Sequence, residues 1–135
     1  MKYSKLRIIS IVSAAILLAS CGSEEPAMPE LSFEETLQEQ LIQAKSGTVI
    51  TIPAGVHEIT RSLSLSVSGV TIAGAGIDES ILSFKNQVQG AEGLLISAND
   101  FMIRDLAIED TIGDALKINQ SNNVQILRVR TEWTN

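Results

Sequence analysis

The chain has 135 residues, of which 44% are hydrophobic but only 4% aromatic, and its formal net charge is −6. This length allows one domain at most, and an aliphatic interior with few rings suits thin stacked layers. The excess of acidic residues argues against binding to nucleic acid, whose phosphates need a basic protein surface. The single cysteine excludes an internal disulfide.

Residues 1–20 have the organisation of a secretory signal peptide. Lys2, Lys5 and Arg7 form a basic start, and an uncharged, mostly apolar run follows from Ile8 to Leu18. This run is too short to cross a bilayer as a mature helix, which needs about 20 residues. We therefore expect export and removal of this segment.

The stretch Leu18–Cys21 (LASC) resembles the lipobox of bacterial lipoproteins. The resemblance implies that Cys21 carries a diacylglycerol thioether and becomes the first mature residue. Two or more acyl chains anchor a protein stably, whereas one anchors it reversibly. Gly22 stands where members kept at the inner membrane often carry Asp, so the resemblance favours the outer membrane of the cell envelope. The alternative is an ordinary signal peptide with an incidental cysteine.

Residues 21–31 are predicted to form a disordered tether, because they are polar, contain two prolines and three glutamates, and lack periodicity. An extended segment of this length reaches roughly 30 Å from the membrane. The rest of the chain, residues 32–135, is predicted to be one domain. Without the signal peptide the chain keeps 7 basic residues against 16 acidic ones.

A capping helix is predicted to open this domain. The sequence Ser32–Glu35 is a capping box, in which each side chain can bond the other residue's backbone amide. Gly47 is predicted to end the helix in the left-handed conformation. The helix is expected to cover the apolar cross-section and the strand edges of the first coil. Its predicted apolar face consists of Phe33, Leu37, Leu41, Ile42 and Ala44.

Short β-branched and aliphatic strands follow from Thr48 onward, separated by Gly, Ser, Asn and Asp. They sort into three series by spacing. The first holds Val49–Ile52, Ile81–Phe84, Leu106–Ile108 and Val129–Thr131. The second holds Leu63–Leu65, Leu94–Ile96 and Ala115–Ile118. The third holds Val70–Ile72, Phe101–Ile103 and Val124–Ile126.

The clearest repeat aligns Asp100–Asp110 with Asn123–Trp133, at an offset of 23 residues. Within each copy the apolar positions alternate, skip two residues and alternate again, which predicts a strand, a bend and a second strand. Wider spacing earlier in the chain predicts a loop of about eight residues inserted near Asn86–Gly93. A 23-residue unit covers roughly 75 Å of extended path, enough for three short strands and three corners.

These observations predict an all-β fold: a right-handed parallel β-helix of about three coils with an N-terminal capping α-helix. The fixed leucine spacing of leucine-rich repeats, the rival at this period, is absent. The fourth coil only begins before Asn135, so we expect that the sequence is the N-terminal part of a longer protein. The alternative is that a partner covers the end of the stack.

Two stretches resemble pectate-lyase-like β-helix proteins: Ser46–Ile59 resembles their opening coil, and Val70–Gly76 with Ser80–Leu82 resembles the start of their second coil. The resemblance covers Leu37–Trp133. It implies the fold, but that superfamily holds polysaccharide lyases, hydrolases, uronate epimerases and non-enzymes. In those enzymes the active site lies on an outer sheet face of the middle coils.

Two outward charge pairs are predicted by the 23-residue offset. Asp105 lies one layer from Arg128, and we favour a solvent-exposed ion pair worth roughly 0–1 kcal/mol over a substrate contact. Glu109 lies one layer from Glu132, and like charges so placed repel. They mark either a cation site or shared-proton pair, or two glutamates that splay apart, and we favour the second.

Asp110 and Asp114 flank a short turn, for which capping is favoured over calcium binding. His57 is the only histidine and lacks a second soft ligand, so a packing role is favoured over a general base. Trp133 could stack on a sugar or be covered by a further coil. Four asparagines are predicted at corners, where they could form ladders between coils: Asn99, Asn119, Asn122 and Asn123.

The sequence therefore predicts no cofactor, no metal site and no nucleic-acid partner. Its expected partners are the membrane, through the lipid on Cys21, and polysaccharide. The favoured expectation is a non-catalytic binding or scaffolding lipoprotein. The alternative is a fragment of a polysaccharide lyase or uronate epimerase, whose cationic catalytic cluster would lie beyond Asn135.

Overall fold

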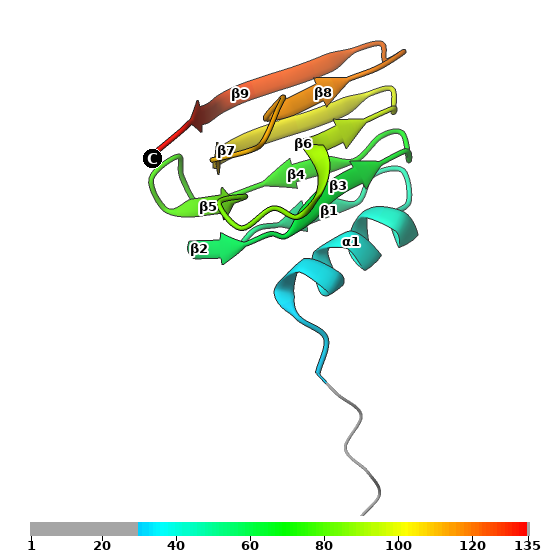
Figure 1. Cartoon of the computed structure of the whole chain (residues 1–135). Coiled ribbons are helices and arrows are strands. Elements are labelled where there is room, and N and C mark those ends of the chain that lie inside the picture. The colour runs from blue at the N-terminus through cyan, green and yellow to red at the C-terminus, as the bar shows by residue number, and fades with distance from the viewer. Residues whose placement is uncertain (1–29, 135) are drawn as a thin grey trace, which may run out of the picture.

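The structure is a computed structural model that describes residues 30–134. One helix and nine strands form a stack with the helix at its base and the last strand at its top (Figure 1). The elements in chain order are α1 (Phe33–Gln43), β1 (Val49–Thr51), β2 (Gly55–Glu58), β3 (Arg61–Leu65), β4 (Thr71–Ala73), β5 (Ser80–Ser83), β6 (Gln89–Ile96), β7 (Phe101–Glu109), β8 (Leu116–Ile118) and β9 (Val124–Glu132).

All strand pairs described are parallel, and they wind as a β-helix of about four turns. One sheet stacks β1, β4, the first half of β7 and the first half of β9. Its second half stacks β2, β5 and the second halves of β7 and β9. The other sheet stacks β3, β6 and β8. The predicted fold class is therefore confirmed, with three coils and the start of a fourth.

The 23-residue register holds along the whole of β7 and β9. Phe101 pairs with Val124, and Ile103 pairs with Ile126. Inside the stack, Ile72 and Ile103 lie one above the other with 1% and 0% of their surface exposed. Aliphatic side chains from all three strand stacks meet there, so the core is a column of layers that burial of apolar surface stabilises.

The predicted first series was wrong in its first member. Val49–Thr51 pairs with Thr71–Ala73, and so belongs to the third series. The strand below β5 is instead β2, with Val56 beside Ile81. An apolar pattern does not reveal β2, because Val56 is exposed and the buried residues Ile52 and Ile59 lie outside the strand.

The capping helix forms as predicted at its start but ends earlier. Ser32 and Glu35 make both bonds of the capping box. The helix ends at Gln43, and Gly47 (φ +88°) lies in the turn that leads to β1. Ile42 was predicted on the buried face but is 66% exposed, since the face that packs on the coil follows Leu37 and Leu41.

The predicted inserted loop is mostly strand. Gln89–Ile96 forms β6, whose Gln89 pairs with Arg61 and whose Leu94 pairs with Leu63. Two residues of β3 therefore face a longer length of β6, and the register shifts between the two pairs. The extra residues form a bulge that stays hydrogen-bonded to the stack, as bulges do when they add length without ending a ladder.

Candidate functional site

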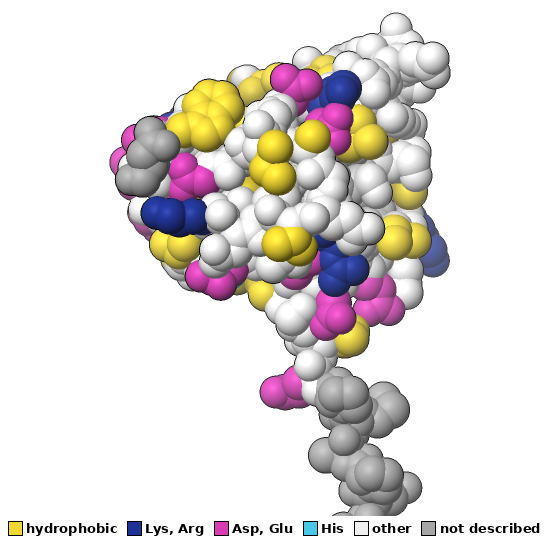
Figure 2. Space-filling model, in the orientation of Figure 1, with side chains coloured by type: hydrophobic (Ala, Val, Ile, Leu, Met, Phe, Trp, Pro, Cys, Tyr) yellow, Lys and Arg dark blue, Asp and Glu magenta, His cyan; other side chains and the backbone are white. Residues whose placement is uncertain are grey.

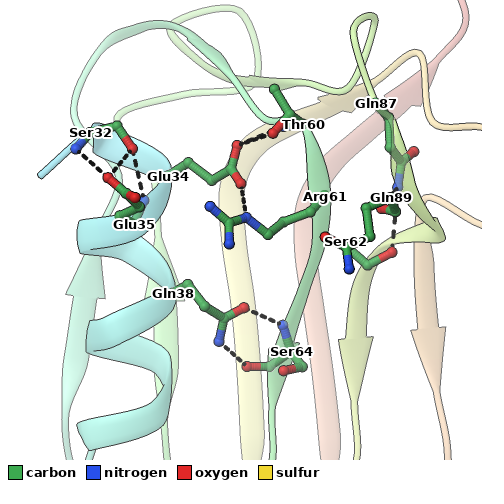
Figure 3. A network of polar contacts seen from close by, with 10 residues as sticks. All are labelled: Ser32, Glu34, Glu35, Gln38, Thr60, Arg61, Ser62, Ser64, Gln87 and Gln89. Carbon is green, nitrogen blue, oxygen red and sulfur yellow. Dashed lines mark hydrogen bonds and ion pairs between the residues drawn. The ribbon is translucent and has the colours of Figure 1, made fainter.

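The lower end of the stack is closed by α1 through a buried carboxylate. Glu34 accepts hydrogen bonds from the Thr60 amide (2.7 Å) and hydroxyl (2.9 Å), and it forms an ion pair with Arg61 (Figure 3). Burial raises the pKa of the Glu34 carboxyl, but the bonds from Thr60 and Arg61 outweigh burial and hold that pKa below its ordinary value. The carboxylate thus joins the helix to the start of β3.

One turn further along α1, the Gln38 side chain bonds the backbone of β3 as a neighbouring strand would. Its amide oxygen accepts from the Ser64 amide at 3.0 Å, and its amide nitrogen donates to the Ser64 carbonyl at 3.3 Å (Figure 3). An edge strand otherwise presents unpaired backbone groups. Helix side chains therefore satisfy the lower edge of β3.

A second polar junction ties three successive coils together through Gln87. Its amide nitrogen donates to the Glu92 carbonyl at 2.9 Å and to the Ser62 hydroxyl at 3.3 Å, and its amide oxygen accepts from the Ile112 amide at 3.1 Å. Gln87 is 9% exposed, so its hydrogen bonds are largely shielded from water. Figure 3 shows Ser62 on β3, with Gln87 and Gln89 next to it.

The corner before β7 and β9 carries the predicted asparagine ladder. The Asn99 amide oxygen accepts from the Asn122 backbone (2.8 Å) and side chain (3.1 Å). Asp100 accepts from the Asn123 side chain at 2.7 Å. Asp100 and Asn123 have φ values of +52° and +55°, which short polar side chains tolerate. Of the predicted asparagines, Asn119 takes part only through its backbone in the bonds found here.

The bend inside β7 and β9 carries the predicted ion pair. Arg128 donates to the Asp105 carboxylate from Nε (2.5 Å) and Nη2 (3.0 Å), and Arg104 also donates to Asp105 at 2.6 Å. The Arg128 and Arg104 bonds hold the pKa of the Asp105 carboxyl below its ordinary value. Both bend residues have positive φ, +59° at Asp105 and +50° at Arg128. The two residues therefore hold a backbone corner as well as a charge pair.

The glutamate pair was predicted wrongly. Glu109 and Glu132 are register partners as expected, but Arg130 lies between them. Its guanidinium reaches Glu109 Oε1 at 2.7 Å and also pairs with Glu132. It also lies 3.5 Å from Asp78. The two carboxylates do not splay apart into solvent, because Arg130 bridges them and its single positive charge offsets part of their combined negative charge.

The aspartates around the turn after β7 have separate roles. Asp110 accepts from the Thr134 amide (2.5 Å) and hydroxyl (2.7 Å), so it caps the chain one layer above. Asp114 lies 3.9 Å from Lys117, which also pairs with Glu92 at 2.8 Å. Across residues 30–134, no group of three or more His, Cys, Asp or Glu side chains is placed to hold a metal ion.

His57 packs as predicted. Its ring stacks on Phe33 with the centroids 3.9 Å apart, and its Nε2 lies 2.9 Å from the Pro53 carbonyl oxygen. The contact joins the start of α1 to β2. His57 thus helps to seat the helix.

The upper end of the stack is an open groove. It has a volume of about 380 Å³ and runs between β8 and β9, with Leu116, Ile126 and Val129 along its floor. Trp133 borders it, with its indole N–H bonded to the Thr111 carbonyl at 2.8 Å and 59% of its surface exposed. This arrangement leaves an aromatic and aliphatic surface in contact with solvent.

The charged side chains on the face in Figure 2 form mixed clusters of acidic and basic residues. Cys21, the predicted site of lipid attachment, lies outside the described residues, as do the signal peptide and most of the tether. In the part of the chain that is described, no helix is long and apolar enough to span a membrane.

Comparison with known proteins adds no relative. No family model, curated protein or solved structure matches this chain.

Several residues at these junctions escaped prediction. Glu34 and Gln38 sit on a helix whose capping pattern says nothing of contacts 26 residues away. Gln87 lies in the predicted inserted loop, Asn86–Gly93, and a lone glutamine gives no periodic signal. The position of Arg130 between the two glutamates could have been found from the 23-residue register. That register pairs Ala107 with Arg130 and Glu109 with Glu132, two residues further along the same strands, so Arg130 and both glutamates share one face.

Proposed function

We propose that this protein is an exported lipoprotein whose parallel β-helix is a non-catalytic scaffold at the cell envelope, in contact with polysaccharide. The lipid on Cys21 holds it to the outer membrane. The scaffold role is supported by one feature of the described coils: their outward charges bond one coil to the next.

The ion pairs that carry this proposal are between layers. Arg128 bonds Asp105, Arg130 bonds Glu109, and Lys117 bonds Glu92, in each case from one coil to the coil below it. A general acid, base or oxyanion donor has to be held where it can meet a substrate. These side chains are instead held against each other, which suits a stiff stack.

The placement of the two ends supports an anchored stack. The described chain starts at Glu30, below α1, whereas β9 lies at the other end of the molecule (Figure 1). An anchor that precedes α1 would therefore leave β9 as the part of the described domain farthest from the attachment point. The stack would present its sides and its upper end to the surroundings of the membrane.

Contact with polysaccharide is proposed on the polar corner that precedes β7 and β9. Asn99, Asp100, Asn122 and Asn123 are all exposed there, and amide and carboxylate groups can bond sugar hydroxyls. The acidic excess of the whole chain opposes uronates. Neutral glycans are therefore the proposed class.

The anchor is tested by Cys21→Ser in a bacterial host. The unchanged chain should sediment with membranes, require detergent for release and incorporate labelled fatty acid, because each buried CH₂ of an acyl chain contributes about 0.8 kcal/mol. The variant should appear in the soluble exported fraction without label. Ser23→Ala is the matched control and should behave like the unchanged chain. Membrane association and labelling that survive Cys21→Ser would contradict the anchor.

A further inference from the structure

The helix α1 closes the lower end of the stack without sharing a backbone ladder with it. Among the residues that the structure describes, every hydrogen bond between α1 and the first coil comes from the side chain of Glu34 or Gln38 (Figure 3). The strands bond one another through their own backbones. The helix can therefore leave the stack without breaking any strand pair.

The chain between α1 and β1 can act as a hinge. The helix ends at Gln43, and Ala44 leaves the helical conformation (φ −52°, ψ 153°). A few residues later the chain is fixed to the stack, because the Gly47 amide donates to the Gly69 carbonyl at 2.7 Å. Hinges are a few residues at the end of an element that absorb a change of direction. The helix can thus swing about Ala44 while the chain from Gly47 onward stays in place.

Apolar packing holds the helix but gives its docking no dependence on pH. Leu37 and Leu41 are buried against the first coil, with 3% and 0% of their surface exposed. Neither side chain ionises. Any dependence of docking on pH therefore comes from the polar contacts at the start of the helix.

Glu34 is the ionisable side chain buried at this junction. It is 6% exposed and pairs with Arg61, the cation that faces it from β3. Glu35 is the neighbouring acid on α1 itself. From β2, His57 stacks on Phe33, one residue before Glu34. These are the charged and titratable groups that surround the buried carboxylate.

Acid favours the released helix over the docked one. Burial raises the pKa of the docked Glu34 carboxyl, but the bonds from Thr60 and Arg61 outweigh burial and hold that pKa below 4.5. A released carboxyl loses these bonds and returns to its ordinary value. The released form therefore binds a proton more readily, and docking weakens as the pH falls below about 4.5.

We propose that α1 is an acid-released cap: protonation of Glu34 lets the helix swing away as one unit while the coils above it stay paired. Coils of a solenoid contact only their neighbours, so the loss of one end leaves the other layers in place. With the lipid anchor proposed above, release would lengthen the link between the membrane and the stack. The release itself needs no anchor and is tested without one, so its failure is distinct from failure of the anchor.

Amide hydrogen exchange of the full chain with Cys21→Ser tests the release. It is measured residue by residue at about pH 6 and about pH 3.5, with rates divided by those of an unfolded chain, to give protection factors. The Thr60 and Ser64 amides report docking, because side chains of α1 are their acceptors. The Met102 amide, bonded to the Val70 carbonyl at 3.1 Å, reports the stack.

The protection factors of Thr60 and Ser64 should fall at least about threefold between the two pH values, because the released state takes up a proton. The protection factor of Met102 should change little. An equal loss at all three amides would overturn the proposal, since the helix would then leave only when the whole stack unfolds. Unchanged protection at Thr60 and Ser64 would overturn it as well.

Three variants assign the effect to one carboxylate. Glu34→Gln should lower the protection of both reporter amides at about pH 6 and leave little further change at about pH 3.5. Glu35→Gln is the adjacent control, because that carboxylate bonds Ser32 rather than the strands. His57→Phe keeps a ring on Phe33 but cannot ionise. Both controls should retain the fall, and an acid response that survives Glu34→Gln or disappears in either control would overturn the proposal.

Discussion

At the residue scale, the molecule depends on a few polar side chains that reach across long stretches of sequence. Glu34 is the clearest, since one carboxylate supplies acceptors for the amide and hydroxyl of Thr60 and a counter-charge for Arg61. An amide left without an acceptor at a buried site costs more than an ordinary hydrogen bond gains. The packing of α1 against the first coil therefore depends on whether the Glu34 carboxyl is ionised.

We predict that Glu34→Gln lowers the free energy of unfolding by roughly 1–3 kcal/mol at pH 7, because the bonds to a charged acceptor weaken and the amide nitrogen faces Arg61. Urea unfolding followed by circular dichroism measures the change. Glu39→Gln, on the exposed side of the same helix, is the matched control and should leave stability nearly unchanged. Equal effects of the two substitutions would contradict the role of Glu34.

The pKa of Glu34 gives this prediction a pH dependence. Its folded-state pKa lies below the ordinary value of 4.5, so the carboxylate stabilises the fold fully above that value. The stabilisation is lost as the pH falls through the folded-state pKa. The difference in stability between the unchanged chain and Glu34→Gln should be constant from pH 7 to about pH 5 and shrink at lower pH. A difference that grows on acidification would refute the assignment.

At the element scale, close stacking of the coils requires small residues at particular corners. Gly74 follows β4, and a Cβ placed there would lie 2.1 Å from the Asp105 carbonyl oxygen and 2.8 Å from Leu106 Cβ. Those atoms belong to the bend of β7 in the next coil. A side chain at this corner would therefore push two layers apart.

We predict that Gly74→Ala destabilises the fold by about 2 kcal/mol or more, since the clash is with backbone that the neighbouring ladder fixes. Gly76→Ala is the matched control two residues away, where the nearest atoms lie at an ordinary 3.5 Å. It should be neutral or slightly stabilising, because alanine restricts the unfolded chain. Thermal melts of the two variants distinguish these outcomes, and similar melting temperatures would contradict the packing argument.

At the scale of the whole molecule, the excess of acidic residues bears on the polysaccharide class that we propose. The chain has 16 acidic and 10 basic residues, and three of the basic ones lie in the predicted signal peptide. Like charges repel strongly at low salt and are screened beyond about 10 Å at 0.1 M salt. The proposed preference for neutral over acidic glycans should therefore depend on salt concentration.

We predict that the exported Cys21→Ser chain is retained on an immobilised neutral glucan and passes unretarded through an immobilised polyuronate at low ionic strength. Raising the salt concentration should narrow the difference, because screening removes the repulsion. Affinity electrophoresis against the two polymers measures it. Retention on the polyuronate alone, or on neither polymer, would contradict the proposed polysaccharide class.

The sequence determined the winding of this chain. The alternation of apolar residues and the 23-residue offset between Asp100–Asp110 and Asn123–Trp133 predicted the pairing of β7 with β9, and the structure has that pairing. The capping box and the bend at Asp105 were also visible, because helix starts and strand corners are local features. Each depends on residues close in sequence or related by one repeat.

Only the tertiary structure decided how the lowest coil is completed and how the outward charges are used. β2 has no buried apolar residue of its own, so its place under β5 depends on neighbours that no pattern records. Arg130 pairs with Glu109, and Glu34 reaches Thr60, only because folding brings separate parts of the stack together. Periodicity reports which side of a strand is apolar, whereas a hydrogen bond between coils depends on the stacking that folding creates.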